Sequence, residues 1–180
     1  MKCWALKTRE DSAGRREFIE HWDQFVKENV VAIGWKFPGI SLKTATKNDI
    51  INALIIQGLT KKRELTAAAN TIVKFRDEVR IGDKILLCRG YAANYPQEVR
   101  LYGTAKITGD LYQDFHSSWW YKRSATIREV FGPGGIEVPR KELASILRKG
   151  SLLLTLQEID CRAFDAIIKR FSHLSLTAQT

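Results

Sequence analysis

The sequence has few cysteines, and their placement argues against the sites that cysteines usually build. Cys3, Cys88 and Cys161 are the only three among 180 residues, far apart and with no C-x-x-C pair and no histidine at ligand spacing. This pattern predicts neither a disulfide framework nor a zinc site. We expect reduced, mostly packed thiols, and we expect no metal ion and no cofactor.

Long hydrophobic runs are also missing. No apolar stretch approaches the roughly 18 residues of a membrane span, and the N-terminal MKCWALKTRED lacks the apolar core of a signal peptide. A cytoplasmic protein that does not bind a membrane is expected. The chain is 44% hydrophobic and long enough to bury a core. We predict one domain over residues 1–172, followed at 173–180 by a tail or the start of a linker to a further C-terminal region.

Acidic residues are in deficit. Against 29 Lys and Arg there are 20 Asp and Glu, which gives a net charge of +9 and favours a polyanionic partner. The basic residues form short clusters inside folded segments and not one amphipathic basic helix, a distribution that favours nucleic acid over an acidic membrane. We expect phosphate contacts from Lys61, Lys62, Arg63, Lys122 and Arg123.

Recognisable catalytic motifs are absent as well. A metal-dependent nuclease needs carboxylates followed by a Glu-x-Lys pair, but the nearest candidates, EVR at 78–80 and EVR at 98–100, carry arginine in place of lysine. No histidine has a serine or cysteine partner in a known motif, and GPGG at 132–135 lacks the residues that complete a phosphate-binding loop. We predict a binding domain and not an enzyme. A small nuclease that uses unrecognised carboxylates is the alternative.

The period of the hydrophobic pattern changes along the chain and predicts a mixed α+β fold. Trp22 and Phe25 fall on the apolar stripe of an amphipathic helix, which places Trp22 in the core. Thr46 with Asp49 three residues later predicts a helix start. In chain order we expect a strand at 2–7, a helix at 15–29, a strand at 30–35, helices at 46–57 and 62–79, strands at 84–89, 99–107 and 119–130, a helix at 139–149, a strand at 151–159 and a helix at 161–171.

Three tryptophans stand at positions where a core does not easily bury them all. Trp35 follows Gly34 at the end of a predicted strand, and Trp119 and Trp120 are adjacent, although neighbouring strand residues point to opposite faces. A protein that reads an unstacked base needs flat rings to stack on it and cations for the flanking phosphates. We expect one ring of the adjacent pair to pack inward and the other to line a base pocket, with alternation slightly favouring Trp120 as the inward ring.

The order of several motifs resembles a known family. CWALKTRED, VVAIGW, FRDEVRIGDKILLCRG, VRLYGTAKITGDL and HSSWWYKR follow one another over roughly residues 1 to 160. This order is similar to that of the EVE and YTH branch of the PUA-like domains, in particular the N-terminal modified-DNA-binding domains of McrB-like restriction proteins. The resemblance implies a small mixed β-barrel with flanking helices.

The resemblance also implies a function and a site. In that family an aromatic cage holds a flipped, methylated base; Trp35 matches one wall and one of Trp119 and Trp120 the other, while Lys7 and Thr8 match the polar pair that approaches the base edge or backbone. The implied ligand is DNA with N6-methyladenine or a modified cytosine. The implied role is the targeting domain of a modification-dependent restriction system, with a McrB-type GTPase domain as partner in the full-length protein. An RNA-binding module that reads a modified or unpaired base is the alternative within the same fold.

Overall fold

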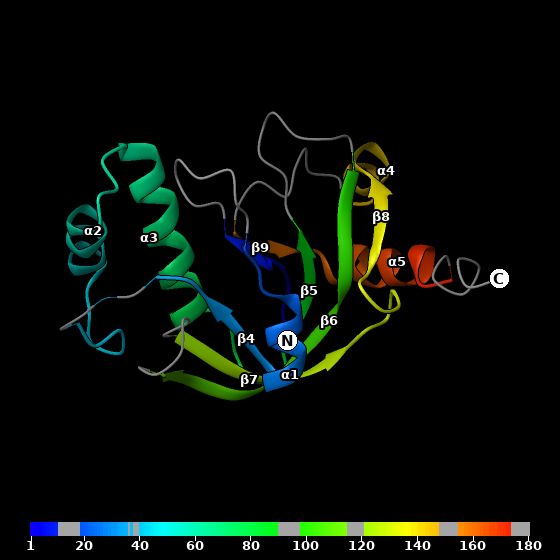
Figure 1. Ribbon diagram of the computed structural model, residues 1–180, viewed down its shortest axis with the longest axis horizontal. Helices are drawn as coiled ribbons and strands as arrows, with labels where there is room; N and C mark the ends of the chain where they lie inside the picture. Colours follow the sequence, from blue (N-terminus) through cyan, green and yellow to red (C-terminus); the bar gives the residue numbers. More distant parts are fainter. Residues whose placement is uncertain are drawn as a thin grey trace.

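A seven-stranded mixed sheet organises the chain in the computed structural model, which describes residues 1–10, 19–35, 37, 40–89, 98–114, 121–147 and 155–173. The strand order is β4-β7-β6-β5-β1-β9, with β8 paired to β6 (Figure 1). The strands are β1 (Cys3–Lys7), β4 (Val30–Ile33), β5 (Lys84–Arg89), β6 (Glu98–Gln113), β7 (Tyr121–Arg128), β8 (Ile136–Pro139) and β9 (Leu156–Ile159), and a separate two-stranded sheet joins β2 (Arg9–Glu10) to β3 (Ile19–Glu20). The helices are α1 (Trp22–Glu28), α2 (Lys47–Ile56), α3 (Lys62–Asp77), α4 (Arg140–Leu147) and α5 (Cys161–Phe171).

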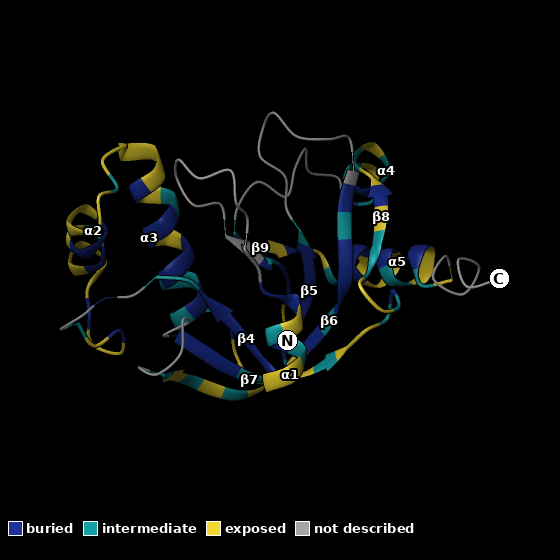
Figure 2. Ribbon diagram, in the orientation of Figure 1, coloured by how far each residue is buried: buried dark blue, intermediate teal, exposed yellow. Residues whose placement is uncertain are grey.

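Helices cover the two faces of the sheet. What we call the front face is packed by α1 and α3, with α2 on the outer side of α3, and the back face is packed by α4 and α5 (Figure 1). Strand alternation divides the core accordingly, since successive side chains point to opposite faces. The front cluster includes Trp4, Leu6, Ile33, Phe75, Leu87 and Tyr121, and the back cluster includes Cys3, Ala5, Leu86, Leu101, Phe164 and Phe171. Figure 2 shows that strands β4 and β5 are buried.

Trp22 lies in the front core, as its position on the apolar stripe predicts. It is buried, and its ring stacks on Tyr102 with 5.3 Å between ring centres. Gly103 makes room for this packing, because a Cβ at that position would lie 2.8 Å from Trp22 Cη2. The Arg128 carbonyl oxygen would lie closer still to that Cβ, so the backbone of β7 and the tryptophan together require glycine at this position.

Most predicted elements are present, and the differences lie at their ends. The helix expected from residue 15 begins at Trp22, because Ile19–Glu20 form β3 and pair with β2. The helix expected from about Pro139 begins at Arg140, because Ile136–Pro139 form β8 against β6. The capping box that Thr46 and Asp49 predict at the start of α2 is confirmed, with Thr46 N 2.8 Å from the Asp49 carboxylate.

The α+β class is confirmed, but the expected barrel is corrected. Among the described residues the sheet is open, with β4 at one edge paired to β7 and β9 at the other edge paired to β1. Closure needs a hydrogen-bonded ladder between the two edges. No ladder in this part of the chain joins β4 to β9.

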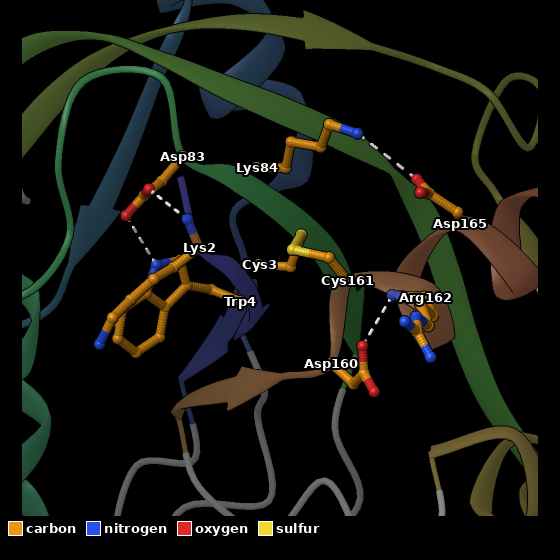
Figure 3. The surroundings of a disulfide bond; sticks show 9 residues. All are labelled: Lys2, Cys3, Trp4, Asp83, Lys84, Asp160, Cys161, Arg162 and Asp165. Carbon is orange, nitrogen blue, oxygen red and sulfur yellow. Dashed lines mark hydrogen bonds and ion pairs between the residues drawn. A yellow bond between two sulfur atoms is a disulfide. The ribbon is translucent and has the colours of Figure 1, made fainter.

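The expectation of three reduced cysteines is wrong. Cys3 and Cys161 form a disulfide with their Cα atoms 5.2 Å apart, across a sequence separation of 158 residues (Figure 3). Cys88 is buried and takes no part in a disulfide. The tertiary pairing explains the bond: β9 runs antiparallel to β1 with Ile159 opposite Cys3, and α5 begins two residues later. The spacing of the cysteines in the sequence does not indicate that Cys3 and Cys161 lie close together.

Asp83, at the entry of β5, fixes the N-terminal strand. Its carboxylate accepts hydrogen bonds from Lys2 N at 2.7 Å and Trp4 Nε1 at 3.0 Å (Figure 3). It also accepts one from Arg80 N at 3.0 Å. Burial raises the pKa of this carboxyl, but these three donors outweigh it and hold the pKa below its ordinary value. The Gly82-Asp83 pair that precedes β5 thus has a structural role: Asp83 holds the N-terminal strand in place through these hydrogen bonds.

Candidate nucleic-acid interface

The end of β4 and the start of β7 lie side by side at one end of the sheet. The strands are antiparallel, and the last residue of β4, Ile33, pairs with the first residue of β7, Tyr121. Gly34 and Trp35 directly follow Ile33. Trp119 and Trp120 directly precede Tyr121 in the sequence and lie outside the described residues.

Trp35 differs from the other tryptophans that the structure describes. Trp4 and Trp22 are 0% and 3% exposed, whereas Trp35 is only partly buried and packs against the edge of the front cluster. A ring that is anchored on one side and accessible on another is held in place without being enclosed. Trp35 therefore has the environment that a stacking surface requires.

The residues after Trp35 are anchored by a second aromatic interaction. Phe37 is 1% exposed, and its ring centre lies 5.9 Å from that of Tyr121, with the planes tilted by 34°. Arrangements of this kind add about 0.5–1.5 kcal/mol beyond the burial of the two rings. Trp35 thus lies between β4 on one side and the buried Phe37 on the other.

A cavity of about 360 Å³ lies next to the start of β7. The described residues that line it are Leu42, Lys43, Leu111, Tyr112, Gln113 and Tyr121. Burial raises the pKa of Tyr121 to about 12, and Gln113 Nε2 lies 3.4 Å from its hydroxyl oxygen. The Tyr121 hydroxyl consequently stays protonated at neutral pH.

The sequence did not point to this cavity. A register shift between Ile107 and Leu111 in the β6–β7 ladder sets which residues of β6 reach it. Bulges of this kind redirect side chains locally, and a simple alternation of apolar and polar residues does not reveal them. Tyr112 and Gln113 therefore carry no sequence signal that marks them as lining residues.

Lys7 and Thr8 sit at a rigid strand end. Lys7 N donates to Thr155 O at 2.9 Å and Thr8 N to Cys88 O at 3.0 Å, while Thr8 O accepts from His21 N at 3.0 Å. Thr8 is fully buried, and its hydroxyl makes a long hydrogen bond of 3.5 Å to Cys88 O. The Lys7 side chain is partly exposed. Of this predicted pair, only Lys7 has an accessible side chain.

Lys122 does not have the exposed position that phosphate binding requires. Its side chain is 3% exposed, and its ammonium lies 2.6 Å from Glu28 and 3.0 Å from Asp114. Burial lowers the pKa of this ammonium, but the hydrogen bonds to the two carboxylates outweigh burial and the pKa is raised. Lys122 is committed to neutralising two carboxylates, which argues against the expected phosphate contact.

Arg123 is buried on the opposite side of β7. It is 2% exposed, and its guanidinium donates to Phe75 O at 3.2 Å and Arg76 O at 2.9 Å, near the C-terminal end of α3. Carbonyls in the last turn of a helix have no partner within the helix, and an arginine can satisfy them. Arg123 joins α3 to the sheet, and its burial argues against the expected phosphate contact, as it does for Lys122.

The third basic cluster is exposed, in contrast to Lys122 and Arg123. Lys61, Lys62 and Arg63 lie at the start of α3 and are all exposed, and Lys61 pairs with Glu64 at 3.0 Å. An exposed pair one turn apart on a helix is a weak interaction of about 0.3–0.5 kcal/mol. These three cations stay available to an anionic partner.

Neither a metal cluster nor a membrane-spanning helix is found in the part of the chain that the structure describes. Within the described ranges no group of three or more His, Cys, Asp or Glu side chains is placed to hold a metal ion. None of the helices described is both long and apolar enough to cross a bilayer.

Comparison with known proteins finds partial similarity to solved structures, at low sequence identity. No protein-family model and no curated protein matches the sequence. A hypothetical protein from Leishmania major has 15% identity and a TM-score of 0.49, covering 100% of this chain and 98% of its own. The YTH domain of the Zygosaccharomyces rouxii MRB1 protein, solved in complex with N6-methyladenosine RNA, has 14% identity and a TM-score of 0.48 over 95% of this chain and 84% of its own.

A third solved structure is that of the human THYN1 protein in complex with DNA containing 5-methylcytosine. It has 12% identity and a TM-score of 0.42, covering 94% of this chain and 97% of its own. Similarities this weak carry no argument about what the present chain binds. The function is therefore inferred from the residues of the site and from the order of motifs in the sequence.

Proposed function

We propose that this protein is a recognition module that binds nucleic acid by holding an unstacked, modified base between Trp35 and one of Trp119 and Trp120. One observation supports the proposal: Ile33, which precedes the partly exposed Trp35 by two residues, pairs with Tyr121, which directly follows Trp119 and Trp120 in the sequence. The net charge of +9 suits a polyanionic ligand.

Covalent geometry supports the proximity of the rings. Trp35 is two residues beyond Ile33, and Trp120 and Trp119 are one and two residues before Tyr121. Consecutive Cα atoms are about 3.8 Å apart, so each tryptophan backbone stays within about 8 Å of the Ile33–Tyr121 pair. Rings attached there can reach the two sides of one base.

The energetics are adequate for base extrusion. Stacking on an aromatic ring contributes about 1–3 kcal/mol per base, which offsets much of the few kcal/mol needed to unstack it. Burying one methyl group adds only about 0.8 kcal/mol. Selectivity for a modified base must therefore also come from pocket shape and from polar groups that mismatch the unmodified edge.

Lys7 and the exposed cluster on α3 complete the proposed interface. The Lys7 side chain approaches the base edge or the adjacent backbone, while Thr8 holds the strand end through its backbone hydrogen bonds. Lys61, Lys62 and Arg63 bind phosphates. The choice of DNA carrying N6-methyladenine or a modified cytosine, and the role as targeting domain beside a McrB-type GTPase domain, rest on the sequence resemblance.

The test is a titration with matched modified and unmodified oligonucleotides, as DNA and RNA, duplex and single strand. Wild-type protein is expected to prefer modified DNA, and Trp35→Ala to reduce that preference by about 5- to 150-fold, the equivalent of about 1–3 kcal/mol of stacking. Its melting temperature should stay close to that of wild type, and Trp35→Phe, which keeps a flat ring, should retain part of the preference. A sharp fall in melting temperature, or a preference for modified RNA, would contradict the proposal.

The adjacent tryptophans give a second test. Of Trp119→Ala and Trp120→Ala, one variant is expected to fold normally and fail to bind modified DNA, and the other to be poorly stable, because neighbouring strand residues face opposite ways. If both variants fold and bind as wild type does, neither ring stacks on the base.

A further inference from the structure

Two arginines on neighbouring strands share a single carboxylate. Arg89, the last residue of β5, lies opposite Arg100 of β6, and Arg100 lies opposite Glu137 of β8. The Glu137 carboxylate is 3.2 Å from Arg89 Nη2 and 2.8 Å from Arg100 Nη2. We call Arg89 and Arg100 the arginine pair.

The arginine pair faces the same side of the sheet as Trp35. Leu87 belongs to the front cluster, and Arg89 follows two residues later on β5, which places its side chain on the front face. The β5–β6 ladder contains a bulge next to Leu87, in which Tyr102 of β6 has no partner on β5. The extra residue is in β6, so the alternation of side chains along β5 is not interrupted. Arg100 is directly opposite Arg89 and therefore projects to the front face as well.

The charges of this group do not cancel. Two guanidinium groups face one carboxylate, which leaves one excess positive charge, and the arginine side chains are 33% and 35% exposed. Lys122 has the reverse arrangement, one cation between two carboxylates, with its side chain only 3% exposed. Counting the described residues alone, the arginine pair thus carries more positive charge than Glu137 neutralises, and it is accessible.

Hydrogen-bond donors are also in surplus. Arg100 Nε is buried and has no hydrogen-bond partner among the residues described. Each guanidinium has five N–H donors in a planar fork, and buried donors in folded proteins are normally paired. An oxyanion with several acceptor oxygens matches this surplus better than one carboxylate does, and arginine forks bind phosphate in a bidentate manner.

We infer that the arginine pair is a phosphate-binding site for the backbone of the nucleic acid that lies across the front face, and that Glu137 is the carboxylate with which the phosphate competes. The identity of the polyanion rests on the proposed function, but phosphate binding is independent of base recognition. This site supplies the interaction with the nucleic-acid backbone that the buried Lys122 and Arg123 do not.

Salt titrations of unmodified duplex DNA test the inference. Arg89→Ala and Arg100→Ala are each expected to weaken binding to modified and unmodified DNA alike, and to reduce the slope of log K against log salt by about 0.9 for each phosphate that the variant no longer neutralises. Glu137→Gln, which keeps the shape and removes the competing charge, is expected to strengthen binding to both. The preference for modified DNA should not change in any of the three.

A matched control is available on the back face. Arg170 of α5 pairs with Glu142 of α4 at 2.7 Å, a partly exposed ion pair on the helices that cover the other side of the sheet. Arg170→Ala removes the same charge from the protein and is expected to leave the salt slope unchanged. An equal effect of Arg170→Ala would show that total charge, and not the arginine pair, sets the affinity.

The outcomes separate this inference from the base-binding proposal. Unchanged slopes in both arginine variants, or weaker binding by Glu137→Gln, would overturn the inference even if Trp35→Ala abolishes the preference for modified DNA. Reduced slopes without any modification preference in wild type would leave the phosphate site standing and overturn the base-binding proposal. Because Glu137→Gln is nearly isosteric, it decides the matter even if an arginine variant fails to fold.

Discussion

The front and back faces of the sheet are completed in different ways. On the back face α4 and α5 cover the strands, and the Cys3–Cys161 disulfide ties α5 to β1. On the front face the core is equally well buried around Trp4 and Trp22, but its edges carry the half-buried Trp35 and the accessible arginine pair. The back face is thus closed by packing and a covalent bond, whereas the front face keeps accessible aromatic and cationic groups at its edges.

The same contrast holds between charged groups. Lys122 and Arg123 are neighbours in sequence but point to opposite faces of β7, and both are buried against partners that satisfy them. Arg89 and Arg100 lie on different strands but opposite each other, and the structure describes a single carboxylate, that of Glu137, beside the two of them. A pair of basic residues in the sequence is thus weaker evidence for a phosphate site than the balance of carboxylates around each cation.

The largest expected effect separates the front core from its edge. Trp22→Ala is expected to lower the free energy of unfolding by about 3–5 kcal/mol, because it leaves a cavity beside Tyr102 and Gly103. Chemical denaturation of Trp22→Ala and Trp35→Ala in parallel checks this. Equal destabilisation by the two variants would erase the distinction between core and edge.

On the back face, removal of the disulfide is expected to change stability without changing binding. Cys161→Ser should lower the free energy of unfolding by about 2–5 kcal/mol under oxidising conditions, since the bond closes a long loop. Wild-type protein treated with a reductant should unfold like Cys161→Ser, which itself should not respond to the reductant. Altered affinity for DNA in Cys161→Ser would show that the two faces are coupled.

Lys122→Met sharpens the comparison between buried and accessible cations. The substitution leaves Glu28 and Asp114 facing each other without the ammonium, and we expect the free energy of unfolding to fall by about 1–3 kcal/mol. The salt slope of DNA binding should match that of wild type. A smaller slope of log K against log salt for Lys122→Met would indicate that Lys122 contacts a phosphate after all.

The smallest expected effect is a pH dependence of stability caused by Asp83, whose carboxylate is hydrogen-bonded to Trp4 of the front core. The pKa of Asp83 is held below its ordinary value in the folded protein, so its contribution to stability is fully present above about 3.9, the usual carboxyl value. That contribution disappears as the pH falls through the lower pKa of the folded state. Unfolding free energies measured from pH 6 to pH 2 should therefore fall less steeply for Asp83→Asn than for wild type.

Local patterns determined much of this protein. The capping box at Thr46 and the apolar stripe around Trp22 depend on residues a few positions apart, and both are present in the structure. The strand expected at 99–107 is also present, but the extra residue Tyr102 interrupts its alternation, so that Leu101 packs in the back cluster and Ala105 in the front cluster. The sequence also marked Trp119 and Trp120 as unusual, because adjacent residues of the strand expected there would point to opposite faces. The order of motifs pointed to a mixed α+β fold, which the sheet and helices confirm.

The tertiary structure alone decided which of these residues meet. The disulfide joins residues 158 positions apart, and the arginine pair exists only because β5 and β6 align Arg89 with Arg100. Burial of Lys122 and Arg123 likewise depends on α1, α3 and the end of β6 packing around β7. The hydrophobic period that distinguishes a helix from a strand can be read from neighbouring residues. Burial, charge balance and strand register depend on which distant segments pack together, and the local pattern does not say which segments those are.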